Sequence, residues 1–136
     1  MNEPEKIRSI LTSARTIAVV GCSPNPARPS HGVTRYLMDE GFEIVPVNPG
    51  HRTILGRPCY PSLSDIPSEI RIDLIDVFRN SSQVAPLVEP AIASGAGFFW
   101  MQEGVVDRES ARRLEEAGLG VAMDRCILKD HARLIR

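Results

Sequence analysis

The sequence predicts an α/β protein built on a doubly wound sheet of five parallel strands. Short apolar runs rich in β-branched residues alternate with segments of helical periodicity along 136 residues, and such runs are typical of buried strands. Glycines stand at the junctions, where the chain must turn. Between Thr16 and Pro49, strand, glycine turn, helix and strand follow one another. Such a βαβ unit is right-handed almost without exception, so its two strands are parallel.

The first half of the chain contains the clearest patterns. A helix is predicted from Pro4, a residue that suits the first helical turn, and its apolar stripe consists of Ile7, Ile10, Leu11 and Ala14. The elements predicted next are a strand at 16–20, a proline-rich loop at 22–31, a helix at 32–40 and a strand at 42–47. An irregular covering segment follows at 50–67, with a short extra strand and one turn of helix.

The second half repeats the pattern. Further strands are predicted at 72–78, 97–101 and 119–123, with helices between them and a last helix at 129–136. Pro90 lies within the first of these helices, so a kink or break is expected there. Of Asp73 and Asp76, we expect one at the start of its strand and the other beside a hydrogen-bonding partner, because a bare buried charge is costly. The predicted spatial order of the strands is 3-2-1-4-5, in one domain spanning residues 1–136.

The composition excludes several classes of protein. Lys and Arg number 16 and Asp and Glu 17, a net charge of -1. This balance argues against binding to nucleic acid or to a membrane surface. Three cysteines at scattered positions predict neither a disulfide framework nor a metal site, and they fit a reducing cytoplasm. The chain shows neither an apolar run long enough for a membrane span nor the pattern of a signal peptide.

The turn after the first strand lies where open α/β sheets bind ligands. It departs from the NAD fingerprint, because Ser23 and Pro26 replace two glycines and Asn48 replaces the acidic residue that holds the ribose. Its backbone N–H groups and the Ser23 hydroxyl can still hold a phosphate. Arg28 adds a positive charge. These residues indicate an adenine nucleotide other than NAD.

Four segments together resemble a known family: VVGCSPNPARPSHGVTRYLMDEGFEIVPVNP, IDLIDVFR, FFWMQEGV and AGLGVAMDRCI. They are similar to the stand-alone CoA-binding proteins, single-domain bacterial relatives of the CoA-binding Rossmann domain in the succinyl-CoA synthetase alpha subunit. The resemblance implies a Rossmann-like fold and a CoA site at four strand ends. A CoA-binding lysine of the synthetases falls on His51, and an unperturbed histidine is mostly neutral at pH 7. The synthetase domain that carries the phosphorylated histidine has no counterpart in this sequence.

The candidate cofactor-binding residues combine this resemblance with the phosphate argument. They are Gly21, Cys22, Ser23, Pro24, Arg28, Asn48, Pro49, His51, Phe78, Arg79, Met101, Gln102, Glu103 and Gly104. Arg28 and Arg79 are as natural on a protein surface as in a phosphate clamp.

The resemblance implies binding of coenzyme A or an acyl-CoA without catalysis by the protein itself. No nucleophile–base pair, acid pair or metal-ligand pattern is recognisable in the sequence. Two alternatives remain: a nucleotide-dependent enzyme, such as a reductase or a component of an acyl-CoA ligase, and an interaction module that has lost the ligand.

Overall fold

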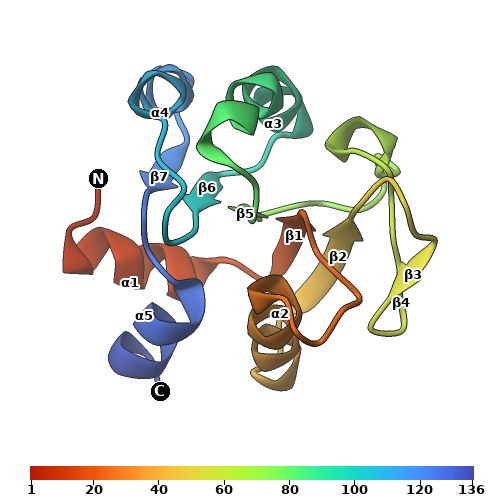
Figure 1. The fold of residues 1–136 in the computed structure, drawn as a ribbon. Helices are drawn as coiled ribbons and strands as arrows, with labels where there is room; N and C mark the ends of the chain where they lie inside the picture. Colours follow the sequence, from red (N-terminus) through yellow and green to blue (C-terminus); the bar gives the residue numbers. More distant parts are fainter.

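The computed structural model describes all residues 1–136 and centres on a five-stranded parallel sheet (Figure 1). The strands are β1 (Thr16–Val20), β2 (Glu43–Val47), β5 (Leu74–Val77), β6 (Phe98–Met101) and β7 (Gly120–Ala122). They lie in the order β2-β1-β5-β6-β7. The predicted α/β class and the five parallel strands are therefore confirmed.

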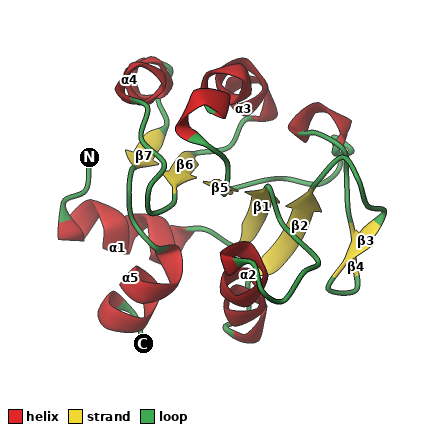
Figure 2. Ribbon diagram, viewed as in Figure 1, coloured by secondary structure: helices red, strands yellow, loops and turns green.

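Helices cover both faces of the sheet (Figure 2). One face carries α1 (Pro4–Ser13), α2 (Pro29–Asp39) and α5 (Ile127–Leu134), and the other carries α3 (Val88–Ser94) and α4 (Arg108–Glu116). Short 3₁₀ turns are η1 (Leu63–Asp65), η2 (Ser81–Gln83) and η3 (Ala85–Leu87), and β3 (Thr53–Ile54) pairs with β4 (Arg57–Pro58) in a hairpin beside the sheet. None of the helices combines the length and hydrophobicity needed to cross a bilayer.

The strands supply two apolar cores, one on each face. Along β1, Ile17 and Val19 pack towards α1 and α2, whereas Ala18 and Val20 pack towards α3 and α4. This alternation follows from the period of two in a strand. Both faces are apolar because helices bury both, as expected of a parallel sheet.

The predicted strand order 3-2-1-4-5 is wrong. In the same numbering the observed order is 2-1-3-4-5, because β5 pairs with β1 and not with β2. The Asp73 carboxylate accepts hydrogen bonds from the backbone N–H groups of Arg15 and Thr16, both at 3.0 Å. These bonds hold the start of β5 against the start of β1. The connection from β2 crosses the α3 face, where Leu63 joins the core that contains Val88, as a right-handed crossover running back across the sheet requires.

The hydrogen bonds along the outer edge of β2 are consistent with β2 being an edge strand, as this order requires. Proline cannot donate to a ladder and is confined to sheet edges. The carbonyl oxygen of Pro46 points outwards and accepts a hydrogen bond from Tyr60 N at 3.1 Å, and Tyr60 O accepts one from Asn48 N at 2.9 Å. A single residue, Tyr60, therefore covers the edge beside Pro46, and no further strand of the sheet pairs there.

Element boundaries differ from the predicted ones where prolines act. Helix α2 begins at Pro29, three residues before the predicted start at Gly32, because proline is favoured in the first helical turn. The break expected near Pro90 is present: two 3₁₀ turns precede α3, and Pro90 stands in its first turn. The covering segment contains the expected short strand and helical turn.

Candidate functional site

A cleft of about 840 Å³ opens at the carboxyl ends of β1, β2, β5 and β6. This edge is where doubly wound sheets bind ligands. Nine of the fourteen candidate residues line the cleft: Gly21, Ser23, Arg28, Asn48, Pro49, Phe78, Arg79, Gln102 and Glu103. Seven residues that the sequence did not single out complete the wall: Pro29, Ser30, Val33, Asn80, Gln83, Val105 and Cys126.

The turn after β1 is held by its own side chains. Gly21 has a φ of +84°, a left-handed conformation that glycine adopts readily, and its N–H donates to Val47 O at 3.0 Å. Ser23 N donates to Ser30 Oγ at 3.0 Å, and Ser23 Oγ accepts from Asn25 N at 3.1 Å. Hydrogen bonds within the protein therefore fix the shape of this loop.

Asn48 ties the ends of β1 and β2 together. Its Nδ2 donates to Cys22 O at 2.8 Å, and its Oδ1 accepts from Gly50 N at 2.9 Å. Both ends of the amide are thus engaged within the protein. The position that holds a ribose-binding carboxylate in the NAD fingerprint is occupied here by a structural side chain.

Two arginines place positive charge on the cleft. Arg28 precedes α2 and is exposed, and the residues of the first turn, Pro29 and Ser30, also line the cleft. Helix N-termini favour anions. Arg79 follows β5; its Nε is buried without a hydrogen-bond partner and lies 3.3 Å from where a Cβ on Gly21 would stand. The guanidinium has four more N–H donors besides Nε, and as a residue of the cleft wall Arg79 can present them to an anion.

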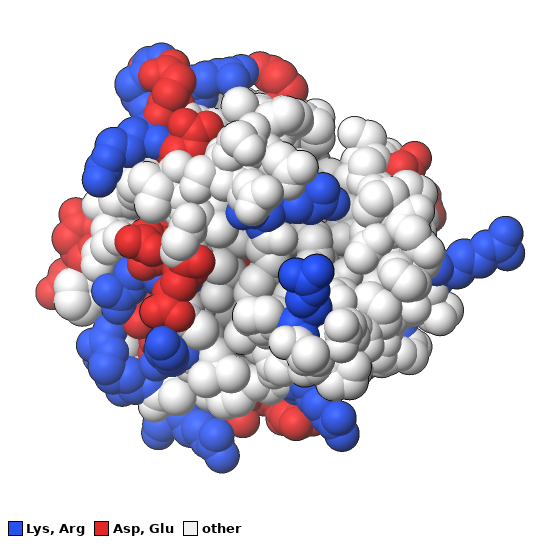
Figure 3. Space-filling view, in the orientation of Figure 1, with Lys and Arg blue, Asp and Glu red and all other residues white.

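Charged side chains are unevenly distributed over the face seen in Figure 3. In the middle of this face a few basic side chains are surrounded by uncharged atoms, whereas acidic and basic side chains intermingle at the left, around α1, α4 and α5. Neither Arg28 nor Arg79 takes part in an ion pair. The cleft therefore presents uncompensated positive charge despite the protein's net charge of -1.

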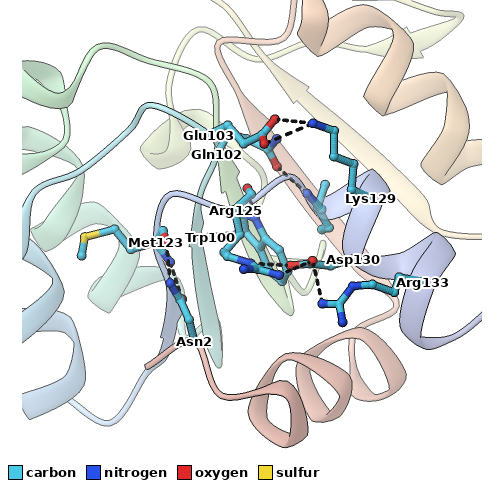
Figure 4. Close-up of polar contacts among 10 residues, drawn as sticks. Asn2, Trp100, Gln102, Glu103, Met123, Arg125, Lys129, Asp130 and Arg133 are labelled. Atoms are coloured by element: carbon cyan, nitrogen blue, oxygen red, sulfur yellow. Dashed lines mark hydrogen bonds and ion pairs between the residues drawn. The ribbon is translucent and has the colours of Figure 1, made fainter.

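The opposite wall of the cleft joins the end of β6 to the start of α5 (Figure 4). Gln102 is only 5% exposed, and its Oε1 accepts from Ile127 N at 3.2 Å. Glu103 forms an ion pair with Lys129 at 3.2 Å. Cys126 directly precedes Ile127 in the sequence and lines the cleft as a half-buried free thiol. This wall carries no unpaired cation.

A second set of polar groups lies beneath the turn and is sealed from it. Burial raises the pKa of Cys22 to about 11, and its thiol contacts the Thr34 hydroxyl at 3.7 Å. Burial also raises the pKa of Cys59. Asp76 is fully buried, neither carboxyl oxygen has a hydrogen-bond partner, and burial raises its pKa well above the usual value. The partner expected for Asp76 is absent: Asp73 at the strand start makes the hydrogen bonds, and burial favours the neutral form of Asp76.

The structure places five of the candidate residues outside the cleft wall. Cys22 and Met101 are 0% exposed, with side chains in the cores on opposite faces of the sheet. They cannot contact a ligand in the cleft, because each residue is buried in the sheet layer. Pro24, His51 and Gly104 are exposed but do not line the cleft.

The cleft also shows what the sequence reasoning missed. Cys126 follows β7, and the ends of parallel strands meet at one edge of the sheet. Gln102 is predicted at this edge because it follows a strand, and the same argument predicts Cys126 there. By contrast, Asn80, Gln83 and Val105 come from loops whose course no local pattern predicts.

The fold and cleft define a doubly wound α/β domain with a cationic site at its topological switch point. Comparison with known proteins identifies the family: the chain belongs to the CoA binding domain family, whose model matches residues 15–132. The resemblance seen in the sequence is thereby confirmed.

Relatives of two kinds are found. The uncharacterized protein YneT of Bacillus subtilis is 41% identical over 134 residues, covering 97% of this chain and 98% of that protein. Acetate–CoA ligase (ADP-forming) I of Archaeoglobus fulgidus is 27% identical over 124 residues, covering 83% of this chain but only 18% of the ligase. A hypothetical protein from Pyrococcus horikoshii has a similar structure, with a TM-score of 0.93, 40% identity and coverage of 98% and 93% of the two chains.

Proposed function

We propose that this protein binds coenzyme A, or an acyl-CoA, in the cleft at the carboxyl ends of the strands and catalyses no reaction of its own. The observation that carries the proposal is the guanidinium group of Arg79, which lines the cleft beside the Gly21 turn and takes part in no ion pair. It fits a phosphate group, which accepts strong charge-assisted hydrogen bonds from guanidinium. Membership of the CoA binding domain family supports coenzyme A as the phosphate-bearing ligand.

The residues present fit coenzyme A better than NAD. Arg28, Arg79 and the N-terminus of α2 provide positive charge for its phosphate groups. Asn48, whose amide is engaged on both sides, offers no carboxylate to the ribose of NAD.

The absence of catalysis by the protein alone is supported by the chemistry of the cleft wall. Its titratable groups are two arginines, Glu103 and Cys126. Glu103 is paired with Lys129, and no histidine or second carboxylate lines the cleft to form an acid–base pair. The similarity to an acetate–CoA ligase supports the alternative that the domain serves a larger enzyme, in which partner domains supply the catalytic groups.

Titration calorimetry with CoA, dephospho-CoA, NAD and NADP tests the proposal. We expect CoA to bind and NAD to bind at least about tenfold more weakly, a difference of about 1.4 kcal/mol. Equal affinity for NAD would contradict the proposed ligand. Failure of every CoA form to bind would favour an interaction module without a ligand.

A further inference from the structure

The three cysteines differ in how accessible their thiols are to a reactant in solution. Cys22 is 0% exposed and Cys59 is 8% exposed, and burial raises the pKa of both thiols. Since the thiolate is the nucleophile in exchange with disulfides, both are protected from reaction. Cys126 is the one cysteine that lines the cleft, and it is half-buried and free.

Hydrogen bonds fix the backbone on both sides of Cys126 (Figure 4). The preceding Arg125 accepts a hydrogen bond at its carbonyl oxygen from Trp100 Nε1 at 2.8 Å. The following Ile127 donates its N–H to Gln102 Oε1 at 3.2 Å. The thiol therefore occupies a defined place on the cleft wall and not a mobile loop.

Gln102 independently points to a ligand at this wall. Its side-chain orientation is set, because Oε1 accepts the Ile127 N–H. Its Nε2 donates to no protein group and is not sealed from the cleft that the residue lines, although the residue is only 5% exposed. A nearly buried amide donor without an acceptor is best satisfied by a carbonyl oxygen of a ligand. The amide-rich pantetheine arm of coenzyme A offers such carbonyls.

The distribution of charge in the cleft indicates how the bound coenzyme A is oriented. Of the two unpaired cations, Arg28 directly precedes α2 and Arg79 follows β5, whereas Glu103 follows β6 and is paired with Lys129. Phosphate groups are favoured beside the two unpaired arginines. The uncharged pantetheine arm, which ends in the CoA thiol, then lies along the wall formed by Gln102 and Cys126.

We infer that Cys126 forms a mixed disulfide with coenzyme A bound in this cleft. The inference rests on the proposed function and adds a covalent step to it. The oxidant is CoA disulfide: the Cys126 thiolate attacks one of its sulfur atoms, the S–S bond breaks, and a new S–S bond joins Cys126 Sγ to that CoA sulfur. The second CoA leaves as thiolate and takes up the proton that Cys126 released. A thiol reductant reverses the step.

The test compares CoA disulfide with pantethine, which has the same disulfide and arms but lacks the nucleotide. The reduced full-length protein is incubated with each at equal concentration, quenched with acid and measured by intact-mass spectrometry and peptide mapping. We expect one CoA on Cys126, added at least about tenfold faster than pantetheine, because binding of the nucleotide raises the effective concentration of the disulfide beside Cys126. Excess adenosine 3′,5′-bisphosphate should slow the reaction with CoA disulfide and leave that with pantethine unchanged.

Two variants and one independent measurement separate the outcomes. Cys126→Ser should take up no CoA, whereas Cys59→Ser should be labelled like the parent. If calorimetry shows CoA binding but Cys126 reacts equally with both disulfides, or not at all, this inference fails and the proposed function stands. If calorimetry shows no CoA binding, both fail together.

Discussion

The carbonyl oxygen of Phe78 occupies the space that a Cβ on Gly21 would need. The two residues directly follow the neighbouring strands β1 and β5, and a Cβ at Gly21 would overlap with this oxygen and lie 3.3 Å from Arg79 Nε. Gly21 also has a φ of +84°. Glycine is required here by two conditions at once, and one of them is the close approach of the next strand end.

Gly21→Ala should unfold more easily than the parent and lose CoA binding. The left-handed conformation alone costs a non-glycine residue about 1–2 kcal/mol, and the overlap with Phe78 O adds about 1–3 kcal/mol. Gly118→Ala is the matched control, because Gly118 has a φ of +98° but nothing within 4 Å of its Cβ position. Urea unfolding and CoA calorimetry of both variants measure the difference. A folded Gly21→Ala protein with the parent's affinity would show that this turn is not the site.

Arg79→Ala should weaken CoA binding by about tenfold or more, since a charge-assisted hydrogen bond contributes about 1.5–3 kcal/mol. Arg28→Ala should have a smaller effect, because Arg28 is exposed to water whereas Arg79 is half-buried. Screening should reduce the loss at Arg28 in high salt. Arg108, exposed on α4 and outside the cleft, is the control. Parent-like affinity of both cleft variants at low salt would assign the phosphates to backbone amides.

Asp76→Asn should stabilise the protein relative to the parent, increasingly so as pH rises above about 4, the ordinary pKa of aspartate. Burial raises the pKa of Asp76 in the folded state, so above about pH 4 the folded chain binds a proton that the unfolded chain has lost. The parent therefore loses stability with rising pH, by up to about 1.4 kcal/mol per pH unit, until the folded-state pKa is passed. Asparagine has no titrating carboxyl group, so the Asp76→Asn variant should lack this dependence of stability on pH. Urea unfolding at pH 4 and pH 8 tests it, with Asp39→Asn at an exposed position of α2 as the control. Identical pH slopes in parent and Asp76→Asn would refute the assignment of a neutral Asp76.

His131 should change the free energy of unfolding with pH in the opposite direction, so that stability falls as the pH drops. Burial between α2 and α5 lowers its pKa, the Glu40 carboxylate raises it and Arg136 lowers it further. Tyr36 OH lies 2.8 Å from its Nδ1. Below about pH 6.5 the unfolded chain binds a proton that the folded chain resists, so stability falls as pH drops towards the lowered pKa. His131→Gln should flatten the change in unfolding free energy between pH 7.5 and pH 5. Exposed His51→Gln should retain it; an unchanged slope in His131→Gln would contradict the prediction.

Some features of the molecule were predictable from neighbouring residues alone. The stripe of Ile7, Ile10 and Leu11, the alternation along β1 and the left-handed Gly21 turn depend on local periodicity and steric limits. The position of the cleft followed as well, because parallel strands bring their carboxyl ends to one edge. Nine of the candidate residues meet there for that reason.

The order of the strands depended on contacts between distant residues. Asp73 bonds to the backbone of Arg15 and Thr16, 58 and 57 residues away, and places β5 beside β1. Pro46 carried a sequence signal for an edge strand, but Tyr60, which covers that edge, comes from a segment with no regular pattern.

The sequence by itself therefore determined the α/β class, the family and the edge of the sheet that carries the cleft, because these follow from local patterns repeated along the chain. The tertiary structure alone decided which side chains reach the cleft. Met101 and Gln102 are adjacent in the sequence. Met101 is buried in the core on the face of the sheet covered by α3 and α4, whereas Gln102 lines the cleft. Burial and hydrogen bonding are set by what packs against each face, and for Arg79, Asp76 and Cys126 those neighbours come from other strands and helices.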